Sequence, residues 1–109
     1  WWEEDRDLTQ RYWNEVLCRP GAAPGKCEPW ICEEIIRRHM NSPSMLAILP
    51  LQDWLGIDGQ LRHADPFYER INIPANPLHY WRYRMHLYLE DMLKEDTFNT
   101  RVKELAARN

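Results

Sequence analysis

The most continuous run of apolar side chains lies near the middle of the chain, at residues 45–51 (Met-Leu-Ala-Ile-Leu-Pro-Leu). Polar residues flank this run, and it is too short to cross a bilayer. A half-exposed strand alternates polar and apolar residues, whereas a strand buried on both faces does not. Pro50 lies near the end of the run, where its missing backbone hydrogen-bond donor disrupts strand pairing least. The pattern therefore predicts one buried strand of a parallel α/β layer, with Gln52 and Asp53 emerging from its carboxyl end.

Apolar residues recur at helical spacing elsewhere in the chain. The helices that this spacing predicts are residues 3–17, 29–40, 80–93 and 98–108. Pro29 suits the first position of its helix, and Asp96 or Thr97 suits the N-cap of the last one. The same spacing predicts core burial of Trp13 and Trp81. The coarse order is helix, helix, strand, long loop (residues 56–77), helix, helix, which is a mostly α fragment with one buried strand.

Composition limits the classes of function. The chain has 109 residues, of which 44% are hydrophobic, and its net charge is −3. The 14 Lys and Arg are outnumbered by 17 Asp and Glu, so a basic nucleic-acid footprint is excluded. No apolar stretch is long enough to cross a membrane, so no membrane partner is expected. The six Trp and five Tyr fit a core, an interface or a surface on which sugar rings stack.

The chain contains three cysteines, Cys18, Cys27 and Cys32. An odd number of cysteines favours reduced thiols, and hence a cytoplasmic protein. Cys27, Cys32 and His39 are one alternative metal-ligand set. Their spacing is not that of a zinc knuckle and a fourth ligand is missing, so we expect structural thiols and no metal or other cofactor.

The acidic residues give no self-contained catalytic pair. Most of them fall on the surfaces of predicted helices, where solvation and helix-end charge explain them. Asp53 differs because it directly follows the predicted strand. A helix cap, a hydrogen-bonding support and direct chemistry all remain open for its carboxylate. No Gly-x-Ser-x-Gly sequence, cysteine nucleophile motif or glycine-rich phosphate loop occurs.

Residues 70–84 combine two asparagines, two prolines and an alternation of aromatic and arginine residues. One interpretation is a rigid turn that positions the following helix. The other is a loop beside a polyhydroxylated ligand, since asparagine amides offer both donors and an acceptor to sugar hydroxyls.

At these residues the chain resembles a known family. Residues 42–58 (SPSMLAILPLQDWLGID) together with residues 69–85 (ERINIPANPLHYWRYRM) resemble the C-terminal part of the 4-alpha-glucanotransferases, the amylomaltases or disproportionating enzymes of the α-amylase clan. The opening residues 1–5 look like the segment that follows the last catalytic aspartate of that family. Residues 74–84 are similar to the longer, plant-cytosolic type. The resemblance covers nearly the whole chain.

The resemblance implies the C-terminal portion of a single catalytic (β/α)8 TIM barrel, with residues 45–51 as its last strand. It implies a transferase of starch, glycogen and maltose metabolism that moves α-1,4-glucan segments between maltooligosaccharides by a retaining double displacement. The nucleophile, the acid/base and the stabilising carboxylate would lie upstream of Trp1. Asn72 matches a family asparagine near the bound glucan, and Gln52 and Asp53 would support the cleft.

On this view the 109 residues are a piece of a larger protein, inactive alone, that closes the barrel and forms part of the cleft wall. The exposed strand of such a piece is expected to be buried by a second copy or a domain swap. Two other hypotheses stay open: a stand-alone helical protein-interaction module, and a small glucan-binding domain. The last requires Trp1, Trp2, Trp54 or Trp81 to line one exposed platform.

Overall fold

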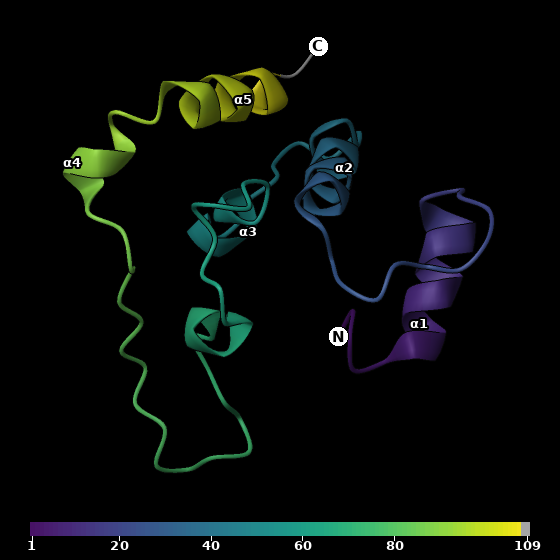
Figure 1. Ribbon diagram of the computed structural model, residues 1–109, viewed down its shortest axis with the longest axis horizontal. Helices are drawn as coiled ribbons and strands as arrows, with labels where there is room; N and C mark the ends of the chain where they lie inside the picture. Colours follow the sequence, from purple (N-terminus) through teal and green to yellow (C-terminus); the bar gives the residue numbers. More distant parts are fainter. Residues whose placement is uncertain (108–109) are drawn as a thin grey trace.

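The computed structural model describes residues 1–107 and consists of helices joined by irregular segments (Figure 1). The helices are α1 (Arg6–Arg11), its π-helical continuation η1 (Tyr12–Val16), α2 (Pro29–Met40), α3 (Leu51–Leu55), the 3-10 helix η2 (Pro66–Glu69), α4 (Leu89–Met92) and α5 (Asp96–Ala106). The radius of gyration is 15.4 Å. A compact chain of this length would have about 13 Å, so packing is incomplete.

The first helical unit, α1 with η1, confirms the helix predicted over residues 3–17. Asp5 caps α1, because its side chain accepts a hydrogen bond from the backbone nitrogen of Leu8 at 3.0 Å. The indole nitrogen of Trp2 donates to the carbonyl oxygen of Pro24 at 2.9 Å, which holds the following loop against the helix. Trp13 is buried as predicted. These contacts build a first hydrophobic cluster, which consists of Trp2, Trp13, Leu17, Ala23 and Ile31.

Helix α2 has the bounds that the sequence predicts. Pro29 occupies its first turn. The basic residues Arg37, Arg38 and His39 lie in its last turn, where positive charge interacts favourably with the negative end of the helix dipole. Its apolar face joins both parts of the core. Ile31 belongs to the first cluster, while Ile36 and Met40 belong to a second one completed by Leu55, Ile57, Leu61, Phe98 and Leu105.

Helix α5 returns to pack against α2 (Figure 1). Because Ile31 of α2 also packs in the first cluster, α2 contacts both the N-terminal and the C-terminal part of the chain. Phe98 and Leu105 bury the apolar side of α5 in the second cluster. Arg101 forms an ion pair with Glu33 of α2, and its Nη2 atom donates to the carbonyl oxygen of Ile57 at 3.1 Å. The last helix is therefore confirmed, but its N-cap is Glu95, which makes no capping side-chain bond. The predicted end at Arg108 lies outside the described residues.

The predicted buried strand is wrong. Residues 1–107 contain no strand at all, and residues 45–50 form an irregular connection between α2 and α3. The side chains of Met45 and Ile48 are each 88% exposed, while Ala47 and Leu49 rest against the second cluster. A strand needs neighbouring strands for its backbone groups, and the described residues supply none. The fold is a small helical piece, and the expectation of a mostly α fragment carrying the last strand of a TIM barrel is overturned.

The helix predicted over residues 80–93 is also wrong, because only α4 forms within it. Residues 70–88 leave η2, swing away from the α2–α3 pair and return along the opposite side as an irregular segment (Figure 1). Trp81, predicted to be in the core, is 75% exposed. We call residues 43–50 and 70–88 the extended segments, and α1, η1, α2, α3 and α5 the packed region.

Candidate functional site

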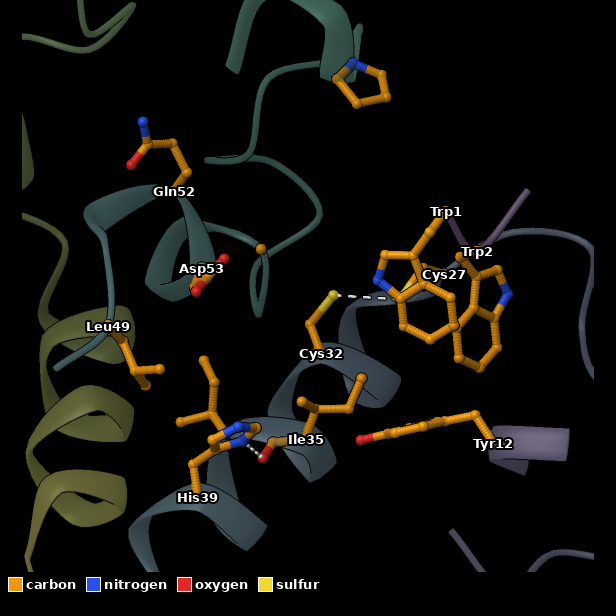
Figure 2. Close-up of a pocket in the computed structure, with 13 residues that line it drawn as sticks. Trp1, Trp2, Tyr12, Cys27, Cys32, Ile35, His39, Leu49, Gln52 and Asp53 are labelled. Carbon is orange, nitrogen blue, oxygen red and sulfur yellow. Dashed lines mark hydrogen bonds between the residues drawn. The ribbon is translucent and has the colours of Figure 1, made fainter. Parts of the chain in front are cut away.

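A cavity of about 640 Å³ opens where the N-terminal residues, α2 and α3 meet (Figure 2). Trp1, Trp2 and Tyr12 form one wall, and α2 supplies the opposite wall through Cys32, Ile35, Ile36 and His39. Gln52 and Asp53 of α3 complete the lining together with Cys27, Leu49, Gly56 and Pro66. The cavity joins segments that are far apart in sequence, and its size lies in the usual range for a ligand pocket.

Gln52 and Asp53 both line this cavity, so two of the three proposed site residues come together. They do so from the first turn of helix α3, which begins directly after Pro50, and not from the end of a strand. Partial burial raises the pKa of the Asp53 carboxyl group, and the nearby His39 opposes this shift. The side chain of Gln52 donates to the carbonyl oxygen of Glu69 at 3.4 Å, which ties α3 to η2.

Helix α3 approaches α2 closely at Gly56. A β-carbon at this position would lie 3.1 Å from the carbonyl oxygen of Asp53 and 3.5 Å from the sulfur of Cys32. The contact with Cys32 is an ordinary van der Waals distance, so a side chain here would mainly crowd the backbone of α3 itself.

The aromatic wall was only partly foreseen. Trp1 packs edge-on against Tyr12 and tilted against Trp2, each with ring centroids 5.5 Å apart. Burial raises the pKa of Tyr12, while Arg38 lowers it. Among the four tryptophans considered for a sugar platform, Trp1 and Trp2 line the cavity, whereas Trp54 and Trp81 do not. Of the two that line the cavity, Trp1 is the exposed ring, because Trp2 is buried.

Asn72 lies apart from this cavity, on an extended segment. The indole nitrogen of Trp81 donates to its side-chain oxygen at 2.9 Å. This bond leaves the Asn72 amide nitrogen as the group that can face a hydroxyl acceptor. A second hollow of about 480 Å³ lies on the same part of the chain and carries the cationic side chains of Arg70, Arg82 and Arg84 on its lining. The structure thus does not bring Asn72 into the cavity that Gln52 and Asp53 line.

The chemistry of the cavity is limited by its charged groups. Asp53 is the single carboxylate on its lining, whereas glycosidic-bond chemistry needs a pair. Within residues 1–107, no group of three or more His, Cys, Asp or Glu side chains is arranged to hold a metal ion. The proposed set of Cys27, Cys32 and His39 does not converge, since the Nδ1 atom of His39 pairs with the carbonyl oxygen of Ile35 at 2.8 Å.

The two inner cysteines form a contact that spacing alone did not reveal. Their sulfur atoms lie 3.5 Å apart, one from the loop before α2 and the other from the helix itself (Figure 2). All three cysteines are free thiols. No helix of the described part of the chain is long and apolar enough to span a membrane.

Comparison with known proteins relates this chain to one enzyme family. Residues 1–90 match the family described as 4-alpha-glucanotransferase. The chain is 37% identical over 105 residues to 4-alpha-glucanotransferase DPE2 of Oryza sativa subsp. japonica, an alignment that covers 96% of this chain. The chain spans only 11% of the length of that relative. No solved structure matches the chain.

Proposed function

This chain belongs to the 4-alpha-glucanotransferase family, and from that premise we propose that the protein containing it transfers α-1,4-glucan segments between maltooligosaccharides. The observation that carries the proposal is the match over residues 1–90, supported by 37% identity to the rice relative along almost the entire chain. Its substrates would be the glucans of starch or glycogen and the maltooligosaccharides derived from them. The free thiols fit a location in the reducing cytoplasm.

The proposed mechanism is a retaining double displacement. A carboxylate nucleophile attacks the anomeric carbon while a carboxylic acid protonates the leaving oxygen, and the acceptor then displaces the enzyme from the covalent intermediate. Such a mechanism needs two carboxyl groups about 5–5.5 Å apart. The cavity lining carries Asp53 alone. The resemblance to the family implies that the catalytic carboxylates belong to a part of the protein before Trp1.

Within that protein, these residues would contribute part of the wall of the substrate cleft. Gln52 and Asp53 would support the wall from α3, where Gln52 also holds η2 in place. Asn72 would donate from its amide nitrogen to a sugar hydroxyl, because its oxygen is engaged by Trp81. The remainder of the catalytic domain would cover the exposed apolar side chains of Met45, Leu46 and Ile48.

Exposed apolar side chains also favour the second candidate function, a protein-interaction module. The two candidates differ in activity. On the leading proposal, the full-length protein releases glucose from maltotriose, and the 109-residue chain does not. Glucose release by the short chain would contradict the assignment of the carboxylates, whereas no release by the full-length protein would favour the interaction module.

The role of Asn72 is tested by Asn72→Ala in the full-length protein. Loss of one hydrogen bond to the glucan should lower kcat/KM for transfer by about 3- to 10-fold. The free energy of unfolding should change by less than about 0.5 kcal/mol, since Asn72 is exposed. Asn41→Ala is the matched control, because Asn41 is an exposed asparagine that lies at the C-cap of α2. Equal transfer kinetics in the two variants would remove Asn72 from the cleft.

A further inference from the structure

Cys27 and Cys32 lie together at the junction of the two hydrophobic clusters and line the same cavity as Gln52 and Asp53. We propose that they form a redox-active dithiol, a modification site that closes to a disulfide when it reacts with a low-molecular-weight disulfide such as oxidised glutathione. This inference does not rest on the proposed transfer activity, because its test measures the oxidation state of the two thiols and not transfer.

The geometry places the pair close to bonding distance. The two sulfur atoms are 3.5 Å apart, and a disulfide needs about 2.05 Å, so an approach of about 1.5 Å closes the bond. Cys32 is held on α2, whereas Cys27 precedes that helix on a loop that begins after Gly25. The loop residue is therefore the one that can move. Figure 2 draws the contact between the labelled Cys27 and Cys32, which both line the cavity and are half-buried.

The surroundings assign different roles to the two sulfur atoms. Either sulfur atom can donate in this contact; with the Cys27 thiol as the donor, the bond lowers the pKa of Cys32 against the opposing effect of burial. The same bond, together with burial, raises the pKa of Cys27. Arg62 lowers the pKa of both, and its Nη1 atom is anchored to the carbonyl oxygen of Cys27 at 2.8 Å. Glu28 acts against Arg62 at Cys27, and Asp53 does so at Cys32. Cys32 also lies near the N-terminal end of α2, where the helix dipole favours a thiolate, so Cys32 is assigned as the attacking thiolate and Cys27 as the resolving thiol.

The reaction balances in two steps. The Cys32 thiolate attacks one sulfur of oxidised glutathione, forms a mixed disulfide and expels one glutathione thiolate. Cys27, losing its proton to solvent, then attacks the Cys32 sulfur and expels the second glutathione thiolate. The two cysteines together lose two electrons and two protons, and the glutathione disulfide gains them as two thiols.

Differential alkylation of the full-length protein tests the proposal. Trypsin cleaves after Lys26 and Arg37, so residues 27–37 form one peptide that carries both cysteines, while Cys18 falls on a separate peptide, residues 12–26. After incubation with oxidised glutathione and alkylation under denaturing conditions, peptide 27–37 should be unalkylated and two hydrogen atoms lighter than its reduced form. A peptide 27–37 that remains doubly alkylated, or carries glutathione without losing those hydrogens, would overturn the proposal.

Single variants then test the assigned order. Cys27→Ser should retain one glutathione on Cys32, because no resolving thiol remains. Cys32→Ser should slow glutathione addition to peptide 27–37 at least about tenfold relative to Cys27→Ser. Cys18→Ser is the control and should leave the disulfide of peptide 27–37 unchanged. Equal rates of addition in the Cys27 and Cys32 variants would contradict the assignment of Cys32 as the nucleophile.

Discussion

The packed region and the extended segments carry apolar residues of the same kinds but use them differently. In the packed region, Ile31 and Leu55 are completely buried. In the extended segments, Met45, Ile48 and Trp81 are at least three-quarters exposed. An apolar side chain gains free energy only from the surface it removes from water. The difference between the regions therefore lies in the presence of a packing partner, and not in the hydrophobicity of the sequence.

The largest expected effect comes from a truncation within the packed region. Leu55→Ala should lower the free energy of unfolding by about 3 kcal/mol, because it empties a fully buried position between α2 and α3. Leu46→Ala is the matched change in an extended segment, where the side chain is 73% exposed, and should cost less than about 0.5 kcal/mol. Urea denaturation of the two variants compares the regions directly. Equal losses would break the distinction between them.

A smaller effect is expected for the polar contact that holds α5 on α2. The hydrogen bond from Arg101 lowers the pKa of Glu33, so this contribution to stability is present above the ordinary value of 4.5 and is lost as the pH falls through the lowered pKa. Glu33→Gln should cost about 1 kcal/mol at neutral pH and almost nothing near about pH 2.

The control for this contact is Glu34→Gln, on the same helix. Within residues 1–107, Glu34 pairs only with Arg38, four residues further along the same helix, at 3.0 Å, and so should contribute about 0.3 kcal/mol. Thermal unfolding of both variants across the pH range separates the two contributions. An effect of Glu33→Gln that persists at low pH would contradict the ionic role of Glu33.

The smallest effect is expected at the cavity, where the packed region meets solvent. Burial raises the pKa of Asp53, so the folded state holds this proton more tightly than the unfolded chain does. Stability contributed by Asp53 is thus lost as the pH rises above its ordinary value of 3.8. Asp53→Asn cannot ionise, so its free energy of unfolding relative to the unsubstituted chain should increase between about pH 3 and pH 7. Urea titrations at several pH values measure this difference, and a decrease over that range would be the contrary result.

The sequence predicted the helices whose ends carry local signals. Pro29 begins α2 and a basic turn ends it, and both signals act over a few residues. Residues 45–51 and 80–93 carried apolar patterns without such signals, and within the described part of the chain only some of their side chains, such as Leu49 and Met92, pack against the core. Periodicity indicates which side chains can be buried together, but it does not supply the second surface.

The candidate site shows the same limit. Gln52 and Asp53 line a cavity, although residues 1–107 do not form the strand that was expected to present them, and their role at a substrate cleft stays a prediction. The aromatic wall and the Cys27–Cys32 contact were missed because they depend on how α2 packs against the N-terminal residues. The five-residue spacing of the two cysteines across a helix start was the one local signal that could have indicated their contact.

The contrast between the two regions is tested most directly by hydrogen–deuterium exchange of the 109-residue chain. The amides of residues 33–40 in α2 should be protected, since helix hydrogen bonds and the core cover them. The amides of residues 46–49 and 83–88 should exchange at close to the rates of an unfolded peptide. Strong protection of residues 46–49 would contradict the account, because it would mean that the apolar run pairs as a strand.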